Sequence, residues 1–241
     1  MLAPAPVSRK ALERELAAAG DLVRAVGVAK FFKTGKGEYG EGDRFIGIKV
    51  PALRKIAQEY VGLDFGDLER LLASPIHEYR MAALEILVAQ FERADEARRE
   101  RIVSFYLRQT ARMNNWDLVD AAAPYILGEH LKARPRQVLD GLAKSSNLWE
   151  RRIAIVSTLA LIRGGDIAET YRIARKLLGD EHDLIHKAVG WALRETGKVS
   201  TEQLTGFLRE NYERIPRTAL RYAIERYPAA QRKRMLAGKF S

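Results

Sequence analysis

A basic residue followed by a short apolar stretch recurs in this 241-residue chain at a spacing that restricts the available folds. The stretch begins at Arg80, Arg152, Lys187 and Arg221, so the intervals are 72, 35 and 34 residues. Because 72 is twice 36, a further copy is expected at position 116, which Trp116 occupies. A period near 35 residues is typical of helix-pair repeats of the HEAT or TPR type. The spacing therefore predicts an α-solenoid.

Turn residues divide the chain into helical segments and leave no alternating strand pattern. Ser8 is expected to cap a helix to about residue 19, Asp21 a second to about 33, and Pro51 to begin a third to about 60. Further helices are predicted at about 65–73, 76–93, 95–111, 114–131, 135–145, 147–163, 166–178, 182–196, 201–213, 216–227 and 229–237. We therefore expect an all-α fold, one domain over residues 1–241, in which HEAT-like helix pairs form a curved solenoid with a basic concave groove.

Residues 33–47 interrupt the helical pattern. This segment carries five glycines among charged residues, which is typical of an exposed loop. Two interpretations stay open at this point. The loop is either a small hairpin or flap beside the groove, or a tolerated surface insertion.

The charge balance favours an anionic partner. The 41 Lys and Arg outnumber the 31 Asp and Glu, for a net charge of +10. Such a surface suits nucleic acid or an anionic membrane, although the same balance also fits a merely soluble basic protein. The absence of cysteine excludes disulfides, thiol catalysis and thiolate metal sites.

Several other classes of protein are disfavoured by local patterns. The longest apolar run, residues 154–162, is too short to cross a membrane, and residues 1–10 lack the apolar centre of a signal peptide, so a cytoplasmic location without membrane contact is expected. Glu41 stands where a P-loop requires lysine, which argues against a nucleotide cofactor. His182 and His186 have helical metal-ligand spacing but no evident third ligand, so no metal site is expected.

Trp116 and Asp120 form the most informative pair of side chains. A separation of four residues places both on one face of a helix. Arg152 and Trp191 fall in later copies of the repeat and are expected to face the same groove. Two aromatic faces, one carboxylate and several cations suit a polyanion whose reacting centre becomes positively charged, such as nucleic acid with a damaged base.

Three separated motifs carry a family resemblance. They are Trp-Asp-Leu-Val-Asp at 116–120, Asn-x-Trp-x-x-Arg at 147–152 and Lys-Ala-x-Gly-Trp-x-Leu-Arg-Glu at 187–195. Together with Phe-Ile-Gly-Ile-Lys-Val-Pro at 45–51, they resemble the AlkD family of HEAT-like-repeat DNA glycosylases. The resemblance implies removal of N3- and N7-alkylated purines from duplex DNA without a cofactor, with the lesion kept in the base stack rather than flipped out.

The resemblance also assigns residues. It places the catalytic site at Trp116, Asp120, Arg152 and Trp191. The residues expected to contact DNA are Arg80, Arg151, Lys187, Arg194, Arg221 and Lys49. Neighbouring helical residues are rotated by about 100°, so only one of Arg151 and Arg152 is expected to face DNA, and Trp149 is expected in the core.

The protein is expected to be a monomer, and the sequence leaves two other functions open. The first is a catalytically silent HEAT-like module that recognises distorted or branched DNA, a possibility raised by the loop at 33–47. The second is a protein-interaction solenoid, for which the basic balance is incidental.

Overall fold

The computed structural model describes residues 7–240 as helices joined by short turns and loops. Within this range the only β-type pairing is an isolated bridge between Arg44 and Ile76, so the all-α prediction is confirmed. The described residues divide into two compact units, between Ala122 and Ala123, and each unit is described by itself. The single domain expected from the sequence stays a prediction. The first six residues of the segment inspected for a signal peptide, 1–6, lie outside the described range.

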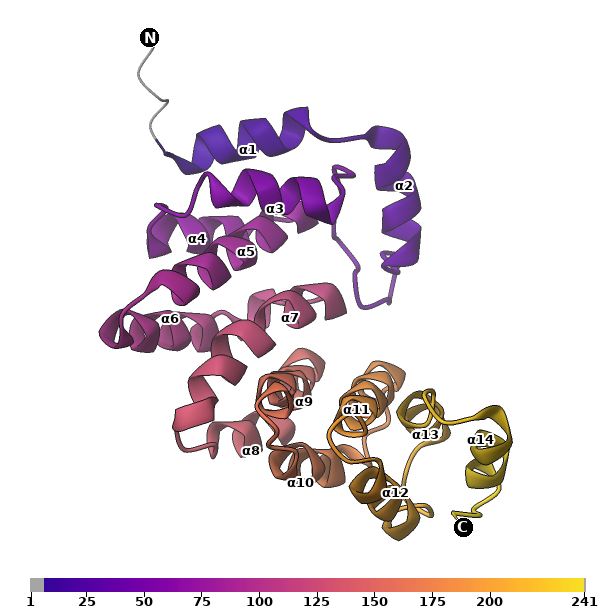
Figure 1. Cartoon of the computed structure of the whole chain (residues 1–241). Helices are drawn as coiled ribbons and strands as arrows, with labels where there is room; N and C mark the ends of the chain where they lie inside the picture. Colours follow the sequence, from indigo (N-terminus) through magenta and orange to yellow (C-terminus); the bar gives the residue numbers. More distant parts are fainter. Residues whose placement is uncertain (1–6, 241) are drawn as a thin grey trace. The chain divides into compact units, whose positions relative to one another are not determined.

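The first unit is built around one long, buried helix, α5, against which α1, α3, α4, α6 and α7 pack (Figure 1). Its helices are α1 (Arg9–Ala18), α2 (Leu22–Phe31), α3 (Val50–Gln58), α4 (Phe65–Leu72), α5 (His77–Arg93), α6 (Glu96–Arg108), η1 (Thr110–Arg112) and α7 (Trp116–Ala122). Because α5 has buried residues on every side, its polar side chains must find partners inside the unit.

Helix capping explains why the predicted helix starts are accurate. The Ser8 hydroxyl accepts a hydrogen bond from the Ala11 N–H at 3.3 Å, and the Asp21 carboxylate accepts one from Arg24 at 3.0 Å. Asn147 does the same for Trp149 at the start of α9 (Leu148–Arg163). Each cap satisfies one of the four N–H groups that a helix start leaves without an intrahelical partner.

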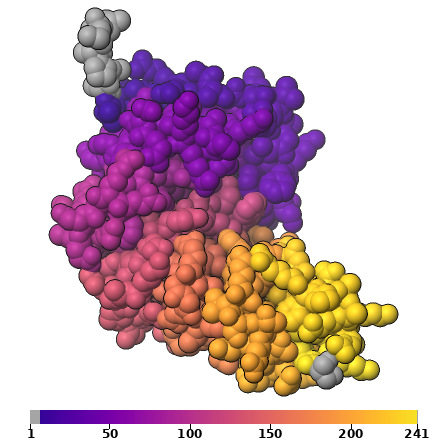
Figure 2. Space-filling model, viewed as in Figure 1, coloured from indigo at the N-terminus to yellow at the C-terminus, as the bar shows by residue number. Residues whose placement is uncertain are grey.

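The second unit stacks helix pairs. Its elements are η2 (Pro124–Gly128), η3 (Leu131–Ala133), α8 (Val138–Ala143), α9, α10 (Ala168–Leu177), α11 (Asp183–Thr196), α12 (Thr201–Glu210), α13 (Arg217–Ala223) and α14 (Ala229–Leu236). Helix α9 packs on α11 and α11 on α13, while α8 and α10 lie beside α9. The helices with repeat markers at 152, 187 and 221 are therefore consecutive neighbours, which confirms the helix-pair repeat. The basic helix α14 lies at the surface, at the yellow end of the chain in Figure 2.

The segment predicted as one helix over 114–131 is helical over most of its length but is not one regular α-helix, because α7 ends at Ala122 and a π-helical turn, η2, follows. Pro124 has no N–H and its ring disfavours a regular helix around it. The hydrogen bonding shifts to a wider register, in which the Gly128 N–H donates to the Ala123 carbonyl at 2.9 Å.

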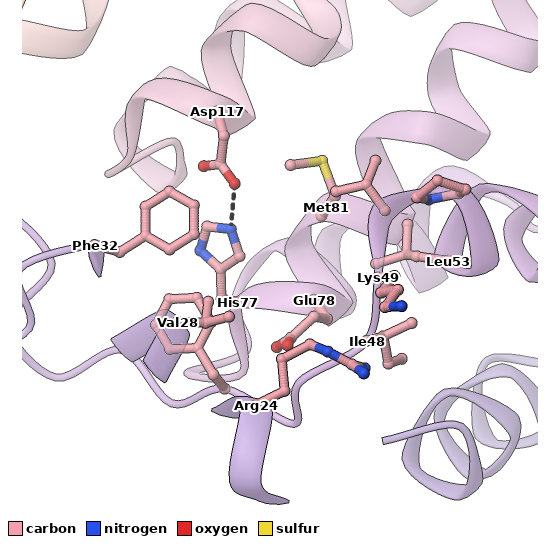
Figure 3. Close-up of a pocket in the computed structure, with 13 residues that line it drawn as sticks. Arg24, Val28, Phe32, Ile48, Lys49, Leu53, His77, Glu78, Met81 and Asp117 are labelled. Carbon is pink, nitrogen blue, oxygen red and sulfur yellow. Dashed lines mark hydrogen bonds and ion pairs between the residues drawn. The ribbon is translucent and has the colours of Figure 1, made fainter. Parts of the chain in front are cut away.

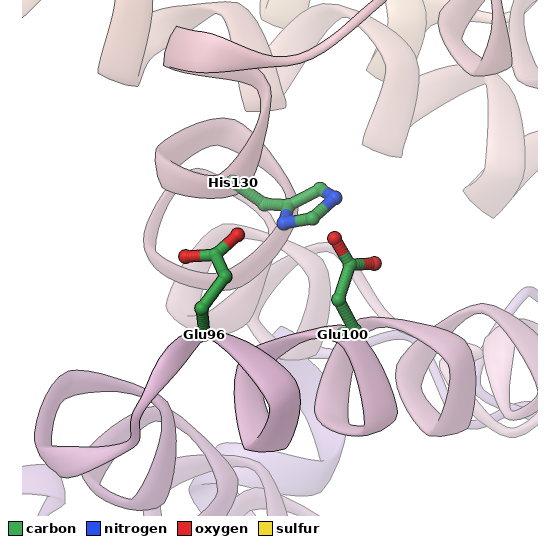
Figure 4. Close-up of side chains that lie close together, drawn as sticks. All are labelled: Glu96, Glu100 and His130. Carbon is green, nitrogen blue, oxygen red and sulfur yellow. The ribbon is translucent and has the colours of Figure 1, made fainter.

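One face of α6 carries exposed acidic side chains. Glu96 and Glu100 lie one turn apart on it (Figure 4). Among residues 7–240, no helix combines the length and the hydrophobicity that crossing a bilayer requires.

Gly190→Ala is expected to destabilise the second unit by about 1 to 3 kcal/mol. A Cβ added at Gly190 would lie 2.5 Å from the Ala219 carbonyl oxygen on α13, so α11 and α13 would have to separate. Urea unfolding measures the effect. Gly206→Ala on α12 is the matched control: nothing lies within 4 Å of its Cβ, so a gain of up to about 1 kcal/mol from helix propensity is expected. Equal stability of the two variants would contradict the close approach.

Candidate active site

Trp116 is the first residue of α7 and rests on the end of α2. Its ring centroid lies 6.0 Å from that of Phe31 and 5.4 Å from that of Phe32. The backbone N–H of Trp116 donates to the side-chain oxygen of the fully buried Asn115 at 2.8 Å. The indole is only half-buried, so one part of it packs on the two phenylalanines while another reaches the surface. An aromatic face held in this way can stack on a base or meet a cation.

Asp120 lies one helical turn beyond Trp116 and is also half-buried. The neighbouring residues Leu118, Val119 and Ala122 are fully buried, and they anchor the opposite side of α7. Burial, and after it the negative charge of Asp120, raise the pKa of the Tyr106 hydroxyl beneath. The face shared by Trp116 and Asp120 therefore combines an aromatic ring with a carboxylate, as the sequence predicted.

A buried histidine, His77, connects α5 to α7. Its Nε2 lies 2.8 Å from the Asp117 carboxylate, and its Nδ1 lies 3.6 Å from the carboxylate of Asp43. The imidazole is 3% exposed and stacks with Phe45, at a centroid distance of 4.7 Å, and with Phe32, at 5.2 Å. Phe32 also contacts Trp116. The histidine is therefore linked to the start of α7 in two ways, by its contact with the Asp117 carboxylate and by the Phe32 ring.

The two carboxylates set the charge state of this histidine. Burial by itself lowers the pKa of His77, but the hydrogen bond to Asp117 and the Asp43 carboxylate 3.6 Å from Nδ1 outweigh it and raise the pKa above its ordinary value. Burial by itself raises the pKa of Asp43, but the nearby His77, the hydrogen bond from Asn114 and the charge of Arg80 leave it lowered. The cluster therefore favours an ionised Asp43 beside a protonated His77.

Arg80 does not face solvent. It is 4% exposed, and its Nη2 donates to Asp43 at 2.6 Å and to Asn114 at 3.0 Å, while Nη1 donates to the Ser74 carbonyl at 2.7 Å. The DNA contact expected from Arg80 stays a prediction, and in this structure its guanidinium is committed to the interior of the first unit. The repeat marker identified a buried structural cation here.

The glycine-rich segment 33–47 is neither a hairpin nor a detached flap. Its first part is largely exposed, but its end is fixed to α5 by the Glu78 carboxylate, which accepts N–H groups of Ile46 at 3.1 Å and Gly47 at 2.7 Å. Gly47 has φ of 81°, and a Cβ there would lie 2.1 Å from the Asp21 carbonyl oxygen, so only glycine fits. The segment is an anchored loop that delivers Asp43 and Phe45 to His77.

A cavity of about 410 Å³ opens beside this cluster in the first unit (Figure 3). Apolar side chains from α2, α3 and α5 line it, together with His77, Glu78 and Asp117. Arg24 and Lys49 add two cations to the lining, and Lys49 is exposed. The DNA contact expected from Lys49 is compatible with its exposure and stays a prediction.

Arg152, in the second unit, is 5% exposed. Its Nη1 donates to the Leu184 carbonyl at 2.8 Å, which ties α9 to the first turn of α11. Arg151 is partly buried, with its Nε 2.6 Å from the Asp180 carboxylate. Trp149 is 8% exposed, which confirms its expected place in the core.

Trp191 is half-buried on α11 and lines a second cavity of about 410 Å³ within the second unit, together with the end of α9. Lys187, one turn earlier, is paired with Asp183 at 2.7 Å. Arg194 forms an ion pair with Glu225, while Arg221 on α13 is exposed. Trp191, Lys187 and Arg194 therefore lie on α11 and Arg221 on α13, the neighbouring helices that carry the repeat markers at 187 and 221.

Comparison with known proteins assigns the family. A family model described as DNA alkylation repair enzyme matches residues 12–227. The chain belongs to this family. One solved structure of similar fold is described as a predicted DNA alkylation repair enzyme from Enterococcus faecalis, with a TM-score of 0.66, 18% identity, and coverage of 87% of this chain and 97% of that one. At that identity the likeness concerns the fold. No curated protein gave a significant match.

For a member of the DNA alkylation repair family, the residues that sequence reasoning overlooked are His77, Asp43 and Asn114. None of them falls on a repeat marker, and their partners lie far away in the sequence. The one available signal was chemical: a histidine at a helix start, an asparagine just before a helix and an aspartate in a loop require partners when buried. Which partners they find depends on the path of the loop 33–47.

Proposed function

We propose that the protein is a monofunctional DNA glycosylase that excises positively charged N3- and N7-alkylated purines from duplex DNA. The observation that carries the proposal is the shared face of α7, where the half-exposed ring of Trp116 and the carboxylate of Asp120 lie one turn apart. Membership of the DNA alkylation repair family supports the choice of substrate.

The chemistry matches these two side chains. The bond between deoxyribose C1′ and the purine nitrogen breaks, and its electron pair neutralises the positive base. The sugar then carries oxocarbenium character until water forms a bond to C1′ and loses a proton. Ionised Asp120 stabilises that sugar cation and orients the water, while the faces of Trp116 and Trp191 interact with the cationic base and sugar. No protonation of the leaving group is required. The resemblance to the AlkD family further implies that the lesion stays in the base stack.

The basic residues take two roles in this proposal. Lys49, Lys187, Arg194, Arg221 and the partly buried Arg151 supply phosphate contacts along the duplex. Arg152, whose guanidinium is buried, acts by fixing the start of α11, and with it Lys187 and Trp191.

The wild-type protein is expected to release 7-methylguanine or 3-methyladenine from methylated duplex DNA without added metal or nucleotide. Chromatography of the released bases measures this, with an unmethylated duplex as the control. A protein that releases neither base, and that binds a four-way junction well above linear duplex at fixed salt, would instead be a silent module for branched DNA.

A further inference from the structure

His77 is a buried titratable group that the proposed chemistry does not use. It lies at the start of α5 and joins three segments: the loop 33–47 through Asp43, its own helix, and α7 through Asp117. We propose that His77, protonated on both ring nitrogens, is a positioning residue that holds Trp116 and the start of α7 in the geometry of the candidate site. The activity part of this inference rests on the proposed function, whereas its structural part does not.

The two carboxylates explain why both nitrogens must carry protons. A neutral imidazole has one N–H, and the other nitrogen presents a lone pair. With the proton on Nε2, which lies 2.8 Å from Asp117, the unprotonated Nδ1 would carry its lone pair only 3.6 Å from the Asp43 carboxylate. Protonation replaces this repulsion by attraction on both sides, in an interior where charges are weakly screened.

Two routes lead from the histidine to the tryptophan. Through the backbone, Asp117 follows Trp116 directly, and its other carboxylate oxygen accepts the Leu118 N–H at 2.8 Å. Through the rings, the imidazole stacks on Phe32, whose centroid lies 5.4 Å from that of Trp116. A movement of His77 therefore displaces both the helix start and the surface on which the indole rests.

The charges around the imidazole determine the direction of the pH effect. Asp43 from the loop and Asp117 from α7 face it, Arg80 and Glu78 lie on α5, and Arg24 and Lys49 line the adjoining cavity. The pKa of His77 is raised in the folded protein. The contribution of this cation is therefore complete below the unfolded value near 6.5 and is lost as the pH rises through the folded pKa.

NMR of the protein with labelled histidine and tryptophan tests the positioning directly. The wild type is expected to show a His77 imidazole with a pKa above 6.5, and an indole N–H signal of Trp116 that shifts with the same midpoint. Asp43→Asn should lower the His77 midpoint, and His77→Gln should abolish the pH response of the Trp116 signal. Trp116→Phe identifies that signal among the three tryptophans.

Single-turnover excision across the same pH range supplies the second readout. His77→Gln is expected to be about ten- to hundred-fold slower near pH 6.5, because a misplacement of about 1 Å costs this much, and to lose the alkaline decline of the wild type. Leu16→Ala, in the core of α1 in the same unit, is the control for a simple loss of stability. It should keep the wild-type pH profile.

The outcomes separate the two proposals. A His77 midpoint at or below 6.5, or a Trp116 signal that does not follow it, would overturn the positioning role whatever the excision assay gives. A wild type without excision, in which both signals still titrate together, would reject the glycosylase while supporting His77 as the residue that positions Trp116.

Discussion

Asp120→Asn is expected to slow excision of 7-methylguanine by roughly 10²- to 10³-fold, which corresponds to about 3 to 4 kcal/mol of barrier. The amide has nearly the size of the carboxylate but no charge, so the sugar cation loses the group that stabilises it. DNA affinity should change little, because a carboxylate contributes nothing favourable to phosphate binding. Single-turnover rates with enzyme in excess over methylated duplex separate the chemical step from binding.

Two further variants make the result specific to Asp120. Glu202→Gln removes an exposed carboxylate in the first turn of α12 and should keep the wild-type rate. Asp120→Glu keeps the charge but moves it by one methylene, so it should fall between the wild type and Asp120→Asn. If Asp120→Asn excised the base as fast as the wild type, Asp120 would have no part in the chemistry.

The helical architecture could be predicted because its signals are local. Ser8, Asp21 and Asn147 are caps that act within three residues, and each begins a helix where expected. The spacing near 35 residues indicated consecutive packing of α9, α11 and α13, since each repeat must bury its apolar face on the next one.

Non-local partners explain where the sequence was insufficient. The position of Arg80 in the repeat suggested a groove, but its partner Asp43 lies 37 residues earlier, at the end of a loop with no periodicity. Pro124 argued against a single regular helix over 114–131. The π-helical turn that forms there, η2, packs on α9, a contact that the local sequence does not specify. The repeat position and the motif at 147–152 indicated that Arg152 was important, but only the fold locates its hydrogen bond to Leu184 on α11.

The aromatic and acidic face of α7 was predictable, while its support was not. A spacing of four residues fixes the relation between Trp116 and Asp120 in any helix. The support consists of Phe31 and Phe32 at the end of α2 and of His77 from α5. Each of these residues lies 40 or more positions before its partner on α7. Sequence reasoning could therefore name the reacting groups but not the residues that hold them.

Arg80→Met is expected to lower the free energy of unfolding by about 3 to 5 kcal/mol, the largest stability effect anticipated for an exchange of one side chain here. Methionine fills much of the volume but leaves the Asp43 carboxylate, whose side chain is 5% exposed, without its closest cation. It also removes the donors to Asn114 and to the Ser74 carbonyl. Urea unfolding at pH 7, followed by circular dichroism, measures the change.

Burial, rather than ion pairing as such, should account for that loss. Arg70→Met breaks a pair with Asp67 at 3.2 Å in which the arginine side chain is 67% exposed, so it should cost less than about 1 kcal/mol. The double variant Asp43→Asn/Arg80→Met removes the orphaned charge and should be more stable than Arg80→Met alone, because the two residues share one network. A loss in the free energy of unfolding for Arg80→Met no larger than that for Arg70→Met would contradict this prediction. The Asp43 carboxylate would then have to contact water or another cation, and the loop 33–47 would be anchored to α5 by Glu78 instead.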